Sequence, residues 1–193
     1  MPPRSRRSAA DTRAEIRRVA LDLFTEKGFD ATSTRDIAAA LGMNQSSLYY
    51  HFAGKDDIVR SLMQTRQHDA EEFLTWLLAQ PVAPGLLRTA ALRWLDATTE
   101  EHVHGQRLAL ANPAVQRRLS GNSHAMAGTF DRVVAVFTGP EPAMADLLLV
   151  RTVFNAVGSV LTAAPDTKAE PADIIAAARR MVLALTRDGG PLP

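Results

Sequence analysis

The sequence predicts an all-α fold for this chain of 193 residues, on three observations. Apolar residues recur at spacings of three and four along most of the chain, which is the period of an amphipathic helix. Alanine, the best helix former, accounts for 32 residues. No segment alternates apolar and polar residues in the β-branched context that is typical of a strand. We expect about nine helices and no internal repeat.

Composition excludes several classes of protein. The chain has no cysteine, which removes disulfides, thiolate nucleophiles and zinc–thiolate sites. No apolar run approaches the ~18 residues that a membrane span needs. The basic start is followed by polar residues, so the apolar segment of a secretory signal is missing. We therefore expect a cytoplasmic protein without a membrane partner.

Positive charge is concentrated at the N-terminus. The net charge of the whole chain is only +1, but residues 1–18 hold six arginines against Asp11 and Glu15. A basic arm, taken here as residues 1–11, is a common footprint of phosphate binding. A solvated tail would have the same composition, and charge alone leaves both interpretations open.

The first helix is predicted from local signals at its two ends. Thr12 and Glu15 have the spacing of a capping box, so the helix is expected to begin at Thr12. Gly28 is placed to end the helix, and an apolar contact between Phe24 and Phe29 would accompany such a cap.

Two short helices then follow each other closely. Ser33 and Asp36 form a cap pair for the second helix, which ends at Gly42. Asn44 can cap a third helix over residues 45–51. Two helices joined by a short turn that contains glycine describe a helix-turn-helix, although many plain αα-hairpins share this spacing.

The side chains of the third helix favour DNA binding over a plain hairpin. Leu48 is the expected inward anchor, and every other residue from Gln45 to His51 can form hydrogen bonds. Gln and Ser reach base edges, whereas Tyr, Ser and His reach phosphate oxygens. Acidic residues are absent from Asn44 to Gly54, as a face that meets phosphate requires.

The segment from Phe29 to Lys55, and above all Leu48-Tyr-Tyr-His-Phe52 followed by Lys55, resembles the DNA-binding domain of the TetR family of bacterial transcriptional regulators. The resemblance covers about residues 12–60. It implies a homodimer with a three-helix DNA-binding domain (12–54) and a helical effector-binding and dimerisation domain (55–193). Most members are repressors that bind operator DNA and are released from it by a small molecule. Met43, Asn44 and Ser46 depart from the commoner residues of the family.

The resemblance also implies nine DNA-contacting side chains. At the second helix, the contacts to backbone or base would come from Ser33 and Thr34. At the start of the third helix, base edges would be read by Gln45, Ser46 and Ser47. The contacts mainly to phosphate would come from Tyr49, Tyr50, His51 and Lys55.

A long helix is predicted over residues 54–80, with apolar residues at both ends and the polar run 64–69 between them. This pattern is typical of a strut whose middle is solvated. Further helices are expected after Pro84, over residues 105–111, and from Pro113 to Gly139, where Asn112 supplies a cap and proline takes the first position.

An effector cavity would be lined mainly by aromatic and aliphatic side chains with few polar groups. The candidates are Trp76, Trp94, His102, Met126, Phe130 and Asn155. We therefore expect a mainly apolar small molecule.

The last two helices are predicted to hold the dimer together. Apolar residues recur at alternating spacings of three and four over residues 147–164 and continue on the last helix, as in a coiled-coil seam. Packing within one chain explains the pattern almost equally well, and the resemblance favours the dimer. The interface candidates are Leu147, Val150, Phe154, Val157, Leu161, Ala178, Met181 and Leu185.

Nothing in the sequence predicts an enzyme. Glu101 and His104 match one ligand pair of a di-iron bundle, but such sites need a second pair and two further glutamates. We expect no metal ion and no cofactor. Two alternatives to an effector-released repressor stay open: a ligand-independent architectural DNA-binding protein, and a helical enzyme or adaptor in which residues 12–60 form a plain hairpin.

Overall fold

The structure is a computed structural model that describes residues 8–163 and 169–187, with the side chains of 113, 114 and 116–124 excepted. Helices account for most of these residues, and the described part contains no strand, so the all-α prediction is confirmed. Most of the predicted basic arm, residues 1–7, lies outside the described residues. The helices are α1 (Ala9–Lys27), α2 (Thr34–Ala40), α3 (Gln45–His51), α4 (Lys55–Leu78), α5 (Leu86–Asp96), α6 (Glu100–Ala111), α7 (Pro113–Thr138), α8 (Met144–Phe154), α9 (Ala156–Ala163) and α10 (Pro171–Leu185).

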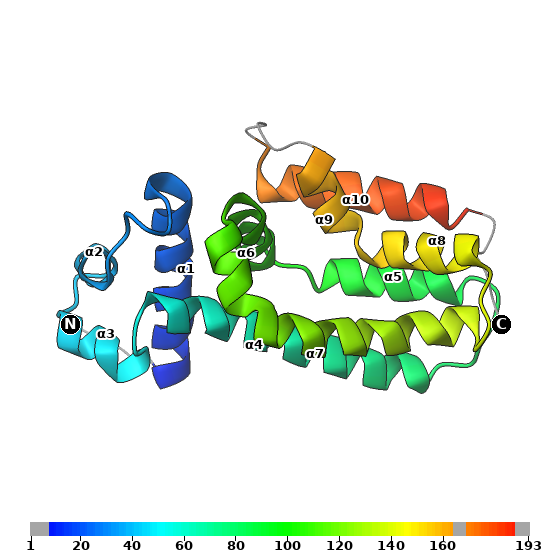
Figure 1. Cartoon of the computed structure of the whole chain (residues 1–193), viewed down its shortest axis with the longest axis horizontal. Coiled ribbons are helices and arrows are strands. Elements are labelled where there is room, and N and C mark those ends of the chain that lie inside the picture. The colour runs from blue at the N-terminus through cyan, green and yellow to red at the C-terminus, as the bar shows by residue number, and fades with distance from the viewer. Residues whose placement is uncertain (1–7, 164–168, 188–193) are drawn as a thin grey trace, which may run out of the picture.

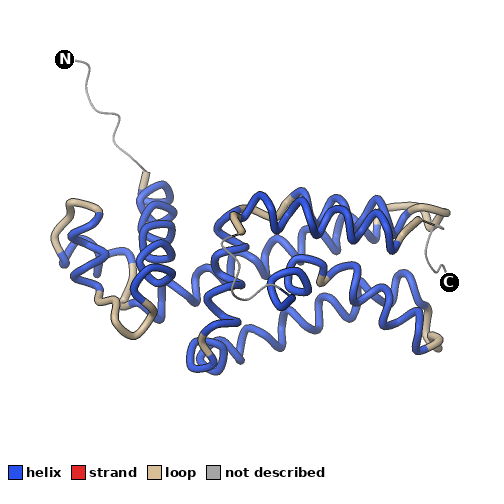
Figure 2. Tube along the Cα trace, turned by 90° about the horizontal axis from the view of Figure 1, so that it is seen from above, coloured by secondary structure: helices blue, strands red, loops and turns tan. Residues whose placement is uncertain are grey.

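The helices form an elongated molecule with two parts (Figures 1 and 2). Helices α1–α3 make a small unit at one end, and α4 leads from it into a larger bundle of α5–α10. Each part has its own apolar core. The N-terminal core also takes Leu62 from α4, Leu108 from α6 and Val115 from α7, so the two parts meet through packed side chains.

The N-cap of helix α1 lies four residues earlier than predicted. Ser8 is the N-cap: its hydroxyl accepts the backbone N–H of Asp11, whose carboxylate accepts the N–H of Ser8, each at 3.0 Å. The capping box expected at Thr12 is therefore wrong, since Thr12 lies within the first turn and donates to the Ser8 carbonyl. The other end is as predicted: Gly28 has φ 87°, and the rings of Phe24 and Phe29 lie 4.9 Å apart.

The local signals of the next two helices are confirmed. Ser33 and Asp36 form a reciprocal capping box at the start of α2. Gly42 has a φ of 64° in the turn, a conformation that is unfavourable for other residues. Asn44 then caps α3 by accepting the backbone N–H of Ser47 at 2.7 Å.

The middle of α4 is only partly solvated, contrary to the prediction. Helix α4 packs along α7 and also meets α6 and α1. Gln67 donates to the hydroxyl of Thr129 on α7 at 3.1 Å, and the guanidinium of Arg66 lies over the ring of Trp94 on α5. The polar run of α4 is half-buried because the neighbouring helices offer it polar and aromatic partners.

Two helix boundaries in the centre of the chain also differ from expectation. Helix α6 begins at Glu100 and not at residue 105, because Thr99 accepts the N–H of His102 and forms an N-terminal capping box. Helix α7 is continuous from Pro113, capped by Asn112 as predicted, to Thr138.

The predicted continuous seam over residues 147–164 is wrong. The chain bends by 78° between α8 and α9, at Asn155. Gly158 makes room for this bend, since a Cβ there would lie 2.5 Å from Oδ1 of Asn155. The break accounts for ten helices in the described residues instead of about nine.

In the described part of the chain, no single helix has the length and hydropathy to cross a bilayer; α8 and α9 meet that test only when they are counted together across their bend.

Candidate nucleic-acid interface and ligand cavity

Helix α3 turns one residue inward and most of the others outward. Leu48 is fully buried in the N-terminal core, whereas Gln45, Ser46 and Ser47 are exposed. The side chains of Tyr49 and Tyr50 are 49% and 84% exposed. A tyrosine so exposed gains little from the fold, which points to a contact outside the chain.

Three of the predicted DNA-contacting residues meet in a polar cluster on this exposed face. Nε2 of Gln45 donates to Oγ1 of Thr34 at 3.1 Å and to Oη of Tyr49 at 3.4 Å. The two hydroxyls lie 3.3 Å apart. The cluster joins α2 to α3, so Gln45 is held on the surface by neighbours from both helices.

Ser33 has a structural task. Its hydroxyl accepts the backbone N–H of Asp36 and donates to the Asp36 carboxylate. These bonds from Ser33 hold the pKa of Asp36 below its ordinary value. The direct DNA contact implied for Ser33 would compete with the cap of α2.

Lys55 also has a structural task, and the phosphate contact implied for it stays a prediction. Its Nζ donates to the carbonyls of Phe29, Asp30 and Thr32 at 2.7, 3.3 and 3.1 Å. It also lies 4.5 Å from the centre of the Phe29 ring. An ammonium has three donors, and all three are used here. Lys55 therefore fastens the loop between α1 and α2 to the start of α4.

Arg13 has a role at the end of α3 that the sequence analysis did not identify. Its guanidinium donates to the carbonyl of His51 and lies 4.1 Å from the centre of the Phe52 ring. The last carbonyls of a helix lack intrahelical partners and attract a cation. The ring of His51 makes an edge contact with Tyr50 at 5.2 Å.

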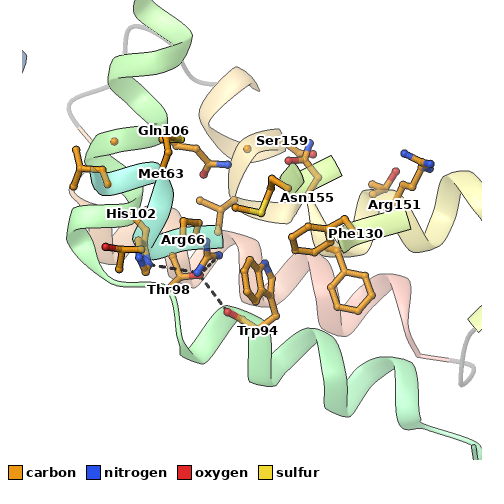
Figure 3. A pocket seen from close by; sticks show the side chains of 18 of the residues that line it. Met63, Arg66, Trp94, Thr98, His102, Gln106, Phe130, Arg151, Asn155 and Ser159 are labelled. Carbon is orange, nitrogen blue, oxygen red and sulfur yellow. Dashed lines mark hydrogen bonds between the residues drawn. The ribbon is translucent and has the colours of Figure 1, made fainter. Parts of the chain in front are cut away.

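A cavity of about 550 Å³ lies in the larger bundle, between α4, α5, α6, α7, α8 and α9 (Figure 3). Five of the six predicted effector-contacting residues line it: Trp94, His102, Met126, Phe130 and Asn155. The sixth, Trp76, does not, because it stacks against Phe73 and under Arg93 outside the cavity. The size lies within the range of small-molecule sites.

Arg66 also lines the cavity, and the sequence analysis did not identify it. Its guanidinium carbon lies 3.5 Å from the centre of the Trp94 ring. It also contacts Oγ1 of Thr98 at 3.3 Å and Nδ1 of His102 at 3.4 Å. Burial lowers the pKa of Arg66 to about 10, which leaves it charged at neutral pH. The run 64–69 looked solvated because no local pattern reveals that Trp94 and α6 cover it.

His102 is neutral and its tautomer follows from its neighbours. Nδ1 accepts the backbone N–H of Thr99 at 3.2 Å, so the proton is on Nε2, which faces the carboxylate of Asp69 at 3.3 Å. Burial, and next the charge of Arg66, lower the pKa of His102 to about 4. The imidazole thus separates the Asp69 carboxylate from the Arg66 guanidinium.

Stability should depend on pH through His102. Its pKa is about 4 in the folded chain and 6.5 when unperturbed, so the unfolded chain binds the proton first as pH falls. Its contribution to stability is complete above pH 6.5 and is lost between pH 6.5 and 4, by roughly 3 kcal/mol. Urea unfolding across this range should show a smaller loss for His102→Gln than for the wild type.

Most predicted dimer-interface residues are buried within one chain. Val150, Phe154, Val157, Leu161 and Ala178 are at most 9% exposed and belong to the core of the larger bundle. Leu147, Met181 and Leu185 are half-buried against this core. Packing within one chain, the other explanation of the apolar pattern, accounts for the burial of these first five residues. The large apolar side chains left exposed on α8 and α10 are Met144, Leu148 and Leu183.

The N-terminal part of the chain is similar to known regulatory proteins. A sequence model described as "Bacterial regulatory proteins, tetR family" matches residues 16–62, which run from α1 into α4. The repressor KstR2 of Mycobacterium tuberculosis is 35% identical over 100 residues, 49% of this chain and 46% of that protein. The regulator AcrR of Shigella flexneri is 30% identical over 103 residues, 52% of this chain and 48% of that protein. The chain thus spans about half the length of these curated relatives.

The whole fold has counterparts among solved structures. The structure of KstR2 from M. tuberculosis matches 94% of this chain and 96% of its own with a TM-score of 0.63 at 18% identity. A TetR-family protein from Rhodococcus RHA1 matches 97% and 100% with a TM-score of 0.60 at 19% identity. At such identities the likeness concerns the fold alone.

These relatives are named as transcriptional regulators and not as enzymes, in line with the expectation that the chain has no catalytic function. The matched segment holds the capped helices α2 and α3, the buried Leu48 and the exposed polar cluster around Gln45. The N-terminal segment is similar to bacterial regulatory proteins of the TetR family, and the whole chain shares the all-helical fold of a TetR-family protein.

Proposed function

We propose that the chain is a sequence-specific DNA-binding transcriptional regulator that acts as a repressor. The observation that carries this proposal is the exposed face of α3, where Gln45 is held by Thr34 and Tyr49 and where no acidic residue occurs from Asn44 to Gly54. Glutamine reads adenine in the major groove through two hydrogen bonds. The family model that matches residues 16–62 includes this segment, and KstR2, which is similar to this chain over 100 residues, is named as a repressor.

Gln45→Ala should change the base preference of the protein at one position in each half-site, by roughly 1–3 kcal/mol if the glutamine contacts its base with two bonds. The measurement is selection from a random duplex library with the wild-type and variant chains. Gln64→Ala, an exposed glutamine on α4, is the matched control and should keep the wild-type preference. An unchanged preference for Gln45→Ala would remove the base-reading role.

We also propose a homodimer whose interface is the exposed apolar face of α8 and α10. Met144 and Leu148 are 67% and 56% exposed on α8, and Leu183 is 42% exposed on α10. The two helices contact each other in the fold, so these side chains can contribute to one surface (Figure 1). A two-fold dimer presents two recognition helices and calls for a palindromic operator with half-sites about one helical turn apart, or a multiple of it.

The double variant Met144→Glu, Leu183→Glu should separate the subunits, because a second copy cannot bury unpaired carboxylates. Since both positions are exposed in one chain, the separated subunits should stay folded, which circular dichroism checks. Light scattering gives the mass. Leu78→Glu, at an exposed leucine on α4, is the control and should remain dimeric. A wild-type monomer at micromolar concentration would end the dimer proposal.

A small molecule in the cavity is proposed to release the protein from DNA. Leu62 lines the cavity and is also part of the N-terminal core, and Met63 lines the cavity and packs against that core. Glu101 lines the cavity as well, and its carboxylate pairs with Arg17 of α1 at 3.0 Å. A ligand that binds the DNA-incompetent arrangement more tightly shifts the population by this differential affinity.

A further inference from the structure

We propose that the cavity binds an amphipathic carboxylic acid, with its carboxylate on Arg66 and its apolar body along Trp94 towards Phe130. This inference rests on the proposed ligand-binding function of the cavity and names the chemical class of the ligand. It replaces the expectation of a mainly apolar molecule.

The first argument is the charge of Arg66. Among the described residues, no carboxylate forms an ion pair within 4 Å of its guanidinium; Asp69, one turn along α4, acts on Arg66 through its charge, and its carboxylate lies 3.3 Å from Nε2 of His102. Thr98 and His102 occupy two of its five N–H groups, and the described residues offer no acceptor to the other three. A buried guanidinium needs an anion and acceptors to offset its lost hydration.

The second argument is the state of the other charged groups that line the cavity. Glu101 is neutralised by Arg17 at 3.0 Å, and Arg151 by Asp131 at 2.6 Å. Arg66 is therefore the lining cation without a carboxylate of its own in the described part of the chain. One guanidinium beside a neutral histidine and a nearby Glu101 suits a single negative charge, whereas a phosphate dianion would lack a second cation.

The third argument is the arrangement of polar and aromatic side chains along the cavity. Arg66, Thr98 and His102 lie together at one end of the view, Trp94 lies beside them, and Phe130 lies farther along (Figure 3). The rings of Trp94 and Phe130 are 5.0 Å apart. The cavity thus has Arg66 at one end and Arg151, paired with Asp131, at the other, with the rings of Trp94 and Phe130 between them, which matches a molecule with a carboxylate on Arg66 and an apolar body (Figure 3).

The test compares two matched pairs of probes with the full chain at neutral pH: decanoate with 1-decanol, and 4-phenylbutyrate with 4-phenyl-1-butanol. Trp76→Phe leaves Trp94 as the single tryptophan, so its fluorescence reports events beside Arg66. Calorimetry checks the same affinities without a fluorophore. In at least one pair, we expect the acid to bind roughly tenfold more tightly than the alcohol, as a charge-assisted hydrogen bond implies.

Arg66→Met should reduce this acid-over-alcohol ratio by about tenfold. Arg151→Met, the other guanidinium of the lining, should leave the ratio unchanged and controls for a general attraction of anions. Circular dichroism checks that each variant is folded. If Arg66→Met does not fold, the acid-over-alcohol affinity ratio of the wild type still tests the proposal.

The proposal is overturned if neither acid binds, if both alcohols bind as tightly as their acids, or if a folded Arg66→Met keeps the ratio. These measurements contain no DNA. If the chain binds the acids through Arg66 but binds no operator, the proposed regulatory function is contradicted and the carboxylate site stands. If it binds an operator but neither acid, the carboxylate site is contradicted and the regulatory function stands.

Discussion

Phe154→Glu should unfold the larger bundle and not merely separate two subunits. Phe154 is 8% exposed, and its ring lies 5.8, 6.1 and 5.9 Å from those of Phe73, Phe130 and Phe137. Removing a buried phenylalanine costs about 3–5 kcal/mol, and an unpaired carboxylate adds its own desolvation. We expect a loss of at least ~4 kcal/mol, which is comparable to the whole stability of many domains.

Urea unfolding followed by circular dichroism measures this loss. Leu78→Glu on α4 is the control, because its side chain is 59% exposed and lies outside the proposed interface, so it should leave the unfolding midpoint almost unchanged. A Phe154→Glu chain that is monomeric yet as stable as the wild type would place Phe154 in an interface between subunits and would contradict the intrachain core.

Lys55→Met should destabilise the N-terminal helices in the absence of DNA by about 3 kcal/mol. Methionine keeps the aliphatic packing but loses three bonds to the carbonyls of the α1–α2 loop and the cation–π contact with Phe29. Hydrogen exchange of α2 and α3 amides reports the change, and Lys27→Met, at an exposed lysine, is the control. Unchanged stability together with a lower salt dependence of DNA binding would restore the phosphate contact.

The parts of the fold that the sequence predicted well depend on neighbouring residues. The caps Ser33, Asn44 and Asn112 and the turn at Gly42 are decided within a few residues, so their patterns can be read directly. The start of α1 was misplaced because Ser8–Asp11 and Thr12–Glu15 offer the same kind of signal one turn apart. Local pattern alone does not choose between them.

The errors in the larger bundle arise from tertiary contacts. The polar run of α4 is covered because Trp94 accepts a guanidinium on its face and Thr129 accepts a bond from Gln67. The bend at Asn155 is absent from the heptad pattern, which continues through it. The aromatic candidates Trp94 and Phe130 do line the cavity, but a buried charge such as Arg66 has no local signature.

The affinity for a selected operator relative to a scrambled duplex of the same composition tests the central claim most directly. At physiological salt, a sequence-specific regulator should prefer the operator by roughly 10³-fold or more, because base contacts add to the shared phosphate contacts. Equal affinity for both duplexes, falling steeply with salt, would contradict the claim and would favour an architectural DNA-binding protein.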